Sequence, residues 1–298
     1  MKIRARFLVL VASLCAGVAA AEPLPGLLED AIRLEQPTNT ARLEALQALL
    51  GSRKLNFELQ PFANARRGRD PREHGHNLVV TAGSGPRDII VGAHFDAASL
   101  ADGTLSAGMV DNAASVVALT RLAESLGRHQ LRHRIRIVFF DMEETGLQGS
   151  SHFAQTMDRG RVAAMVNLDI SGYGDAVFAG PSAAEGNAAL YDALRRVCSR
   201  DRLTCVESAA FPASDDRSFQ AAGMPNVSLA ILPRLEAHQM WLLLNGGRDA
   251  GLAAGFRPEI LRTIHTTEDR ASRLDAAAMT LAHDVAMALI LELDASLE

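Results

Sequence analysis

Short apolar runs bounded by turn residues recur along the chain from residue 77 onward. Most of them are rich in β-branched residues and too short to form helices, which is typical of buried strands. The predicted strands are Asn77–Thr81, Asp88–Ala93, Arg134–Phe140, Ala163–Leu168, Ala176–Ala179 and Asn226–Ile231.

Apolar residues at three- and four-residue spacing predict helices around these strands. The first helix is expected from about Leu27 to Leu50, and the last over Arg273–Glu292. The others are predicted over Asn112–Leu126, Gly146–Met157, Ala184–Ser199 and Ser214–Ala222. Strands that alternate with helices indicate an α/β protein whose largely parallel or mixed sheet is covered on both faces. No internal repeat or Gly/Ser-rich linker divides the chain, so we expect one domain.

Two segments follow neither pattern. Residues 63–76 are polar and basic, and this composition predicts a solvated surface loop. Residues 232–264 contain Trp241, the only tryptophan, and fit neither a simple strand nor a simple helix. Because long segments of this kind are often functional or mobile, residues 232–264 could form a lid over a site or an ordinary surface insertion.

The first residues have the pattern of a secretory signal peptide. Lys2, Arg4 and Arg6 precede an apolar run from Phe7 to Ala21, and small residues at positions 18 and 20 favour cleavage after residue 20 or 21. The run is short for a membrane anchor, and Leu14 before Cys15 argues against a lipoprotein. We therefore expect a signal peptide over residues 1–20, export, and a mature domain over 21–298.

The composition narrows the range of functions. The chain has 298 residues, 48% of them hydrophobic, and a formal net charge of −5. These values are typical of a globular protein, and the mild acidic excess argues against a nucleic acid as partner. No later stretch suggests a membrane span, so we expect a soluble mature protein with no membrane partner. Its two cysteines, Cys198 and Cys205, could form a disulfide after export or stay as small buried side chains.

Side chains that can bind metals follow the ends of the predicted strands. They are His94, Asp96, Asp111, Asp141, Glu143, Glu144, Asp169 and, late in the chain, His265. Each of them alone has an ordinary structural explanation, such as a helix cap or a solvated helix start. Ligand sites in α/β sheets form beyond the carboxyl ends of strands, so their joint occurrence there is informative. Histidines and carboxylates without a cysteine suit zinc in a hydrolytic site.

The same residues lie in a series of ordered motifs. The motifs are His94-x-Asp96, Gly108-x-x-Asp111-Asn112-Ala113-x-Ser115, Glu143-Glu144-x-Gly146-Leu147-x-Gly149-Ser150, Asn167-Leu168-Asp169, Ser214-Asp215, Gly223-Met224-Pro225 and His265-Thr266-x-x-Asp269. In this order they resemble the zinc aminopeptidases of peptidase family M28, among them secreted bacterial leucyl-type enzymes. The resemblance runs from about Asn77 to Asp275.

The resemblance implies a three-layer α/β/α fold of the phosphorylase/hydrolase type and a site with two zinc ions per chain. By matched position, Asp111 would bridge the two zincs. His94 and Asp169 would complete one metal, and Glu144 and His265 the other. Glu143 would be the general base acting on a zinc-bridging water, and Asp96 would orient His94. The family also implies a cis peptide bond between Asp111 and Asn112.

The sequence departs from the family pattern in two places. The family usually has Ser-Asp-His where this chain has Ser214-Asp215-Asp216, and it often has Met at the position of Ile170. That histidine is not a metal ligand in the family. The change therefore affects the expected substrate pocket and leaves the five expected ligands in place.

The function most strongly indicated is that of an exported zinc exopeptidase, in the periplasm or outside a bacterial cell, acting on peptides. One alternative is a glutaminyl cyclase-like acyltransferase with a single zinc. Another is a binding protein without catalysis on the same scaffold, since a fold does not determine function. The retention of Glu143 beside five apparent ligands argues against the last alternative. The sequence leaves the substrate side chain and the oligomeric state open.

Overall fold

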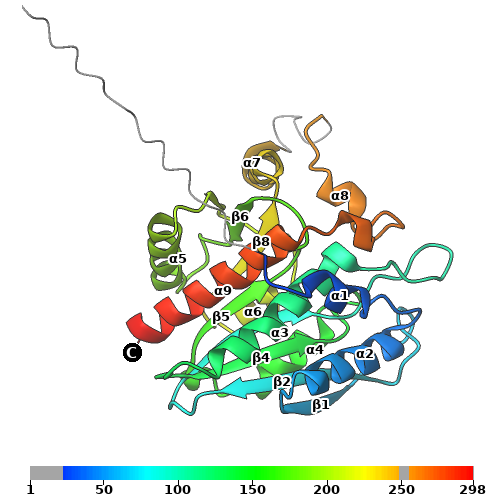
Figure 1. Ribbon diagram of the computed structural model, residues 1–298, viewed down its shortest axis with the longest axis horizontal. Coiled ribbons are helices and arrows are strands. Elements are labelled where there is room, and N and C mark those ends of the chain that lie inside the picture. The colour runs from blue at the N-terminus through cyan, green and yellow to red at the C-terminus, as the bar shows by residue number, and fades with distance from the viewer. Residues whose placement is uncertain (1–22, 248–254, 298) are drawn as a thin grey trace, which may run out of the picture.

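A single sheet of eight strands organises the part of the chain described by the computed structural model, residues 23–247 and 255–297 (Figure 1). The predicted signal peptide lies outside the described residues. The strand order is β1-β2-β4-β3-β5-β8-β6-β7. The strands are β1 Phe57–Ala63, β2 His74–Ala82, β3 Asp88–His94, β4 Arg134–Phe140, β5 Val162–Leu168, β6 Ala176–Gly180, β7 Cys205–Glu207 and β8 Asn226–Leu232.

The sheet is mixed, as predicted. Strands β4, β3, β5 and β8 form a parallel run at its centre, and β6 pairs with β7 in parallel. The pairs β1–β2, β2–β4 and β6–β8 are antiparallel. Because neighbouring parallel strands point the same way, the central run brings four carboxyl ends to one edge of the sheet, where a site can form.

Helices cover both faces of the sheet (Figure 1). They are α1 Leu27–Ile32, α2 Asn39–Ser52, α3 Ala114–Leu126, α4 Gln148–Thr156, α5 Ala188–Arg200, α6 Asp216–Ala221, α7 Arg234–Leu242, α8 Ile260–Thr263 and α9 Ala276–Ser296. Alternate residues of β3 point to opposite faces. Ile89 and Val91 pack in the cluster that contains α3 and α9, whereas Ile90 packs with Phe153 of α4 and Phe219 of α6. The predicted α/β class with two helical layers is confirmed.

The helix predicted over Leu27–Leu50 is wrong in one respect, because the chain forms two helices there. Pro37 disfavours a helical conformation of the residue before it and has no N–H for a helical hydrogen bond. The next residue, Thr38, caps α2, since its hydroxyl oxygen accepts a hydrogen bond of 3.1 Å from the backbone N–H of Ala41. α1 already ends at Ile32, and the proline and the cap keep the chain non-helical until α2 begins at Asn39.

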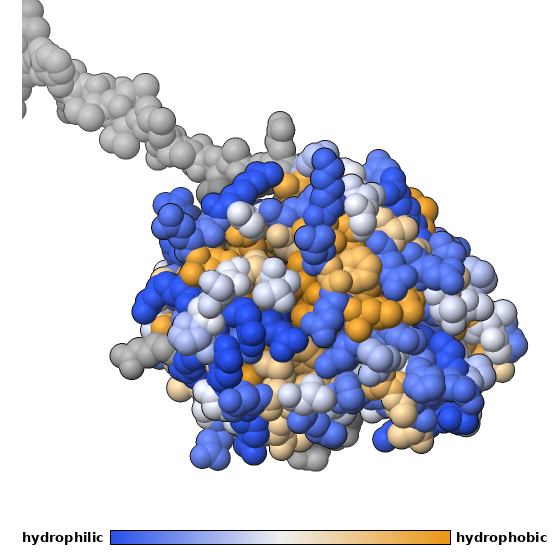
Figure 2. All heavy atoms as spheres, turned by 90° about the horizontal axis from the view of Figure 1, so that it is seen from below, coloured by the Kyte–Doolittle hydropathy of each residue, from blue (hydrophilic) through white to orange (hydrophobic). Residues whose placement is uncertain are grey.

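The pattern of apolar residues in the sequence does not predict the two edge strands, β1 and β7. Pro61 lies inside β1, and a proline is tolerated there because one side of an edge strand has no partner for its N–H groups. Figure 2 views the molecule from below, the side on which Figure 1 places β1, and hydrophilic side chains surround exposed apolar ones on this face. Leu59 of β1 is among the exposed apolar residues. Strand β7 spans only three residues, too few to give a pattern.

Helix α9 corrects the expectation that no later segment resembles a membrane span. Among the described residues it is the one helix whose length, 21 residues, and composition would allow it to cross a membrane. In this structure more than half of its most apolar stretch is buried inside the protein. Val285, Leu289 and Leu293 are fully buried in the cluster that also contains α3 and α5. A helix in the core of a protein needs the same apolar composition as a membrane span. This explains why α9 is long and apolar enough to cross a membrane.

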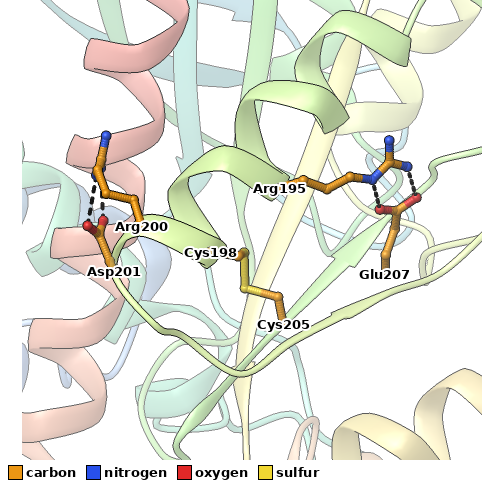
Figure 3. Close-up of a disulfide and its surroundings, with 6 residues drawn as sticks. All are labelled: Arg195, Cys198, Arg200, Asp201, Cys205 and Glu207. Carbon is orange, nitrogen blue, oxygen red and sulfur yellow. Dashed lines mark hydrogen bonds and ion pairs between the residues drawn. A yellow bond between two sulfur atoms is a disulfide. The ribbon is translucent and has the colours of Figure 1, made fainter. Parts of the chain in front are cut away.

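A disulfide joins Cys198 near the end of α5 to Cys205 at the start of β7, with the two Cα atoms 6.3 Å apart (Figure 3). Of the two alternatives for these cysteines, the structure shows the disulfide. An ion pair of 2.6 Å between Arg195 and Glu207 joins the same helix and strand beside it. Both links hold the short strand β7 at the edge of the sheet.

Candidate metal centre

Three of the predicted ligands arrive at the carboxyl ends of parallel strands. His94 is the last residue of β3, and Asp169 follows β5 directly. Glu144 lies four residues after the end of β4, in the turn that leads into α4. The shared direction of these strands brings the three side chains to the same edge of the sheet.

The other two predicted ligands arrive from connecting segments. Asp111 lies in the turn Met109–Ala113 that precedes α3. His265 comes shortly after α8, and its side chain is 54% exposed, whereas that of Asp111 is 6% exposed. The centre therefore has a buried side at Asp111 and an open side at His265.

Asp111 lies between the two histidines. Its Oδ1 is 3.0 Å from Nε2 of His94, and its Oδ2 is 3.1 Å from Nε2 of His265. Nε2 of His265 is also 3.1 Å from Oε2 of Glu144, and Nε2 of His94 is 3.6 Å from Oδ1 of Asp169. The two oxygens of the Asp111 carboxylate thus belong to different clusters of polar atoms, one around His94 and the other around His265.

The five predicted ligands form two groups that share Asp111. Ligand atoms of His94, Asp111 and Asp169 lie within 4.8 Å of one another, and so do those of Asp111, Glu144 and His265. The predicted convergence of these residues is confirmed, although they span positions 94 to 265. Oδ1 of Asp169 and Oε1 of Glu144 are buried and accept no hydrogen bond from the described residues. Imidazole nitrogens and carboxylate oxygens without a thiolate are a donor set that suits zinc.

The electrostatics of the centre favour added positive charge. Burial alone would raise the pKa of Asp111, but hydrogen bonds from His265 and His94 outweigh it and hold the pKa well below its usual range. Hydrogen bonds to Asp111 and Glu144 raise the pKa of His265 to about 11. Burial raises the pKa of Glu144 to about 7 and that of Glu143 well above its usual value. Buried carboxylates crowded in this way are stabilised by a neighbouring cation.

Asp96, which was expected to orient His94, has a second set of contacts. Its backbone oxygen is 3.2 Å from Nδ1 of His94, and its carboxylate Oδ1 is 3.6 Å from the same nitrogen. The carboxylate also accepts hydrogen bonds from the backbone N–H groups of Glu143 and Glu144, at 3.0 and 3.2 Å. Asp96 therefore holds the backbone of both glutamates as well as facing His94.

The peptide bond between Asp111 and Asn112 is cis, so this expectation is confirmed. The side chain of Asn112 contacts both neighbours of Asp169. Its amide nitrogen donates to the carbonyl oxygen of Leu168 at 2.9 Å, and its amide oxygen accepts from the N–H of Ile170 at 3.2 Å. One asparagine thus connects the segments that carry Asp111 and Asp169.

Asp269 holds the backbone of the turn that carries Asp111, a role that sequence reasoning missed. Its carboxylate accepts hydrogen bonds from three consecutive backbone N–H groups, those of Met109 at 3.0 Å, Val110 at 2.6 Å and Asp111 at 3.1 Å. The sequence offered one signal, the position of Asp269 in the motif that begins with His265. Asp269 connects the segment of one predicted ligand with the turn of another.

Replacing Asp269 with Asn is expected to destabilise the protein by about 1–3 kcal/mol, because the amide presents an NH₂ group to buried donors and leaves at least one unsatisfied. We expect zinc affinity to fall by about 10- to 100-fold, as for other residues that support metal ligands. Urea unfolding with a chelator and a separate zinc titration measure the two effects. The exposed Asp102, which accepts from the N–H of Thr104, gives the control variant Asp102→Asn. Equal effects in both variants would contradict the assigned role.

Arg42 of α2 is a second residue that sequence reasoning missed. Its fully buried guanidinium donates hydrogen bonds to the carbonyl oxygens of Phe95, between His94 and Asp96, and of Gly108, at 2.7 Å, before the Asp111 turn. Burial lowers the pKa of Arg42 to about 10, and the nearby carboxylates Asp96, Asp269 and Asp111 oppose this shift. Nothing in the sequence near Arg42 indicates these distant partners.

The basic segment 63–76 is only in part the solvated loop that its composition predicts. Arg72 forms a bidentate ion pair with Asp141, at 2.9 and 3.0 Å, and also contacts Asp70. Asp141 is fully buried and follows β4, two residues before Glu143. An isolated buried carboxylate is costly, so the segment folds back to supply the arginine that pairs with it.

The two acidic residues of Ser214-Asp215-Asp216, the motif that differs from the family pattern, are buried. Asp215 and Asp216, at the start of α6, are 0% and 1% exposed. Burial raises the pKa of each to about 7. The buried environment therefore favours protonation of these carboxyl groups.

The described parts of the segment, residues 232–247 and 255–264, contain the helices α7 and α8, which corrects the expectation of no simple helix. Glu236 of α7 accepts hydrogen bonds from the Tyr173 hydroxyl at 2.6 Å and from the N–H of Ile260 at 2.9 Å. Ala237, Met240 and Ile260 pack with Phe178 of the sheet in one apolar cluster. The flanking parts of the segment are thus fixed to the strand-end loops.

Comparisons with known proteins support the fold. The family model of peptidase family M28 matches residues 77–290. No curated protein matches the sequence. The chain resembles a zinc aminopeptidase from Bacillus subtilis, BSAP, with a TM-score of 0.60 and 19% identity. The match covers 74% of this chain and 50% of that structure, so this chain spans about half the length of that structure.

Two other bacterial structures match more of the chain. The aminopeptidase LapA of Legionella pneumophila has a TM-score of 0.66 and 18% identity over 91% of this chain and 71% of that one. A glutaminyl cyclase of Porphyromonas gingivalis has a TM-score of 0.69 and 16% identity over 89% of this chain and 96% of that one. At these identities, the structural likeness shows a shared fold.

Proposed function

Because the chain belongs to peptidase family M28, we propose that it is an exported zinc exopeptidase that uses two zinc ions to remove the N-terminal residue from peptides. The observation that carries the proposal is the position of Asp111 between His94 and His265. One carboxylate shared by two groups of ligand atoms suits a centre of two metals. Zinc aminopeptidases among the similar structures support the same function.

The proposed ligands divide into two sets. His94 and Asp169 would hold one zinc, Glu144 and His265 would hold the other, and Asp111 would belong to both sets. Zinc, when bound, polarises a scissile carbonyl and lowers the pKa of a water molecule. The exposed side of His265 leaves this centre accessible to a peptide.

Glu143 is the proposed general base, because it is buried beside the ligands and is assigned to neither set. Its carboxylate accepts a proton from the attacking water and passes it to the amine nitrogen that leaves when the peptide bond breaks. Asp96 fixes the position of Glu143 through the backbone N–H of this residue, 3.0 Å from the carboxylate. Burial raises the pKa of Glu143 well above its usual value, so the carboxylate depends on nearby positive charge to stay ionised.

A second candidate function is that of a glutaminyl cyclase. The observation in its favour is the match to the Porphyromonas gingivalis glutaminyl cyclase, which covers 96% of that chain, compared with 50% for the Bacillus aminopeptidase. The shared position of Asp111 favours two metals over one and therefore the peptidase. A non-catalytic scaffold is disfavoured by the presence of Glu143.

The proposal extends to the chain as a whole. We propose that residues 1–20 direct export to the periplasm or the outside of the cell and that residues 21–298 form one domain. The disulfide between Cys198 and Cys205 supports an oxidising compartment. The net charge of −5 supports peptides over nucleic acids as substrates.

An activity panel tests the proposed function. Aminoacyl p-nitroanilides and a peptide with N-terminal glutamine are incubated with the full chain, with and without a chelator. The proposal predicts release of p-nitroaniline that the chelator abolishes. Cyclisation of the glutamine peptide without hydrolysis would favour the cyclase, and no reaction of either kind would favour the non-catalytic scaffold.

A further inference from the structure

A cavity of about 390 Å³ lies between the start of α6 and the turn Leu243–Gly247 that follows α7. Its walls include the side chains of Phe211, Leu243 and Leu244, and Arg217 of α6 lines it as well. The volume falls within the range of small-molecule sites. None of the five proposed metal ligands lines this cavity.

The apolar wall of the cavity packs in one cluster with residues that neighbour the proposed ligands. Phe211, Leu243 and Leu244 belong to the apolar cluster that also contains Val110, Ile170 and Ile264. Each of the last three is the chain neighbour of a proposed ligand, namely Asp111, Asp169 or His265. The cavity therefore lies on the same apolar cluster as the segments that carry three of the proposed ligands, and this places it on the side of the metal centre formed by those segments.

Arg217 supplies the charge of the cavity. Its side chain is exposed, and Nη2 donates a hydrogen bond of 3.4 Å to the carbonyl oxygen of Phe211, on the cavity wall. Among the described residues, this guanidinium makes no other hydrogen bond and no ion pair. Other arginines near the centre, such as Arg72, are occupied by carboxylates. The guanidinium of Arg217 is thus available to a ligand.

We propose that this cavity receives the side chain of the substrate's N-terminal residue and that Arg217 selects an acidic one. The inference rests on the proposed exopeptidase function. The apolar walls contact the methylene groups of such a side chain, and the planar fork of a guanidinium matches a carboxylate with two hydrogen bonds.

The test compares Glu-, Gln- and Leu-p-nitroanilide with the full chain and the variant Arg217→Met. These substrates have no C-terminal carboxylate, so any effect of charge comes from the side chain. We expect the wild type to prefer Glu over Gln in kcat/KM. Arg217→Met is expected to lower kcat/KM for Glu by about 10- to 100-fold, the effect of losing hydrogen bonds to a charged group, and to leave Leu within about twofold. The control Arg128→Met changes an exposed arginine just after α3 and should change no ratio.

The outcomes separate this inference from the proposed function. Chelator-sensitive hydrolysis of Leu with the same Glu/Gln ratio in wild type and Arg217→Met would overturn the role of Arg217 and leave the function standing. An effect of Arg217→Met on dipeptide substrates alone would also overturn this role. It would mean that Arg217 binds the C-terminal carboxylate of the substrate. If no substrate is hydrolysed, the proposed function fails. Calorimetric binding of free L-glutamate and L-glutamine then decides the inference, since a preference for glutamate that Arg217→Met abolishes supports the pocket and its absence overturns it.

Discussion

Replacing Glu143 with Gln is expected to lower kcat by about 10²–10⁴-fold, the contribution typical of a general base. Glutamine keeps the size of the side chain but accepts no proton from water at neutral pH. KM should change less than kcat, because the lost interaction belongs to the transition state. The backbone N–H of Glu143 still donates to Asp96 in the variant, so the turn should keep its conformation.

Metal analysis and steady-state kinetics on the same preparation measure this effect. Since Glu143 is assigned to neither set of ligands, the variant should retain the zinc content of the wild type. A Glu143→Gln protein with near-normal turnover would contradict the mechanism, and the base would then have to be another group in the centre. Loss of zinc together with activity would instead make Glu143 a ligand.

Replacing Asp111 with Asn should abolish activity and reduce zinc binding at both positions. The substitution turns one carboxylate oxygen into an NH₂ group, which cannot bind a metal, and removes the charge that both histidines face. We expect zinc affinity to fall by at least about 100-fold, the upper end of the effect found for residues that only support ligands. Titration with zinc under competition from a chelator measures the loss.

Two further variants make the Asp111 result specific. Glu144→Gln should weaken only the zinc that His265 shares, so that one zinc per chain remains. Glu44→Gln, on the exposed side of α2, removes a carboxylate of the same kind away from the centre and should retain both. Normal zinc content in Asp111→Asn would rule out a shared ligand at this position.

The buried centre of the sheet was predictable, and its edges were not. Strands β3, β4, β5 and β8 carry apolar residues toward both helical layers, so they appear in the sequence as largely apolar runs. Strand β1 contains Pro61 and faces solvent on one side, and its pattern is therefore mixed. Helix α7 has the exposed apolar residues Leu235 and Trp241, and no apolar stripe marks it as a helix.

The residues of the candidate centre were predictable because they occur in ordered motifs at strand ends. Their convergence is confirmed by the structure, whereas their role as zinc ligands stays a prediction. The supporting residues Arg42 and Asp269 act on backbone groups more than 50 positions away, contacts that only the fold creates. Arg72 was predicted to be solvated because nothing in its own segment indicates that Asp141 is buried.

The number of zinc ions bound per chain tests the central claim most directly. The full chain is purified, saturated with zinc, dialysed against metal-free buffer and measured by elemental analysis and by native mass spectrometry. The shared carboxylate of Asp111 predicts two zinc ions per chain. One zinc per chain would favour the cyclase alternative, and none would contradict a metal centre at these five residues.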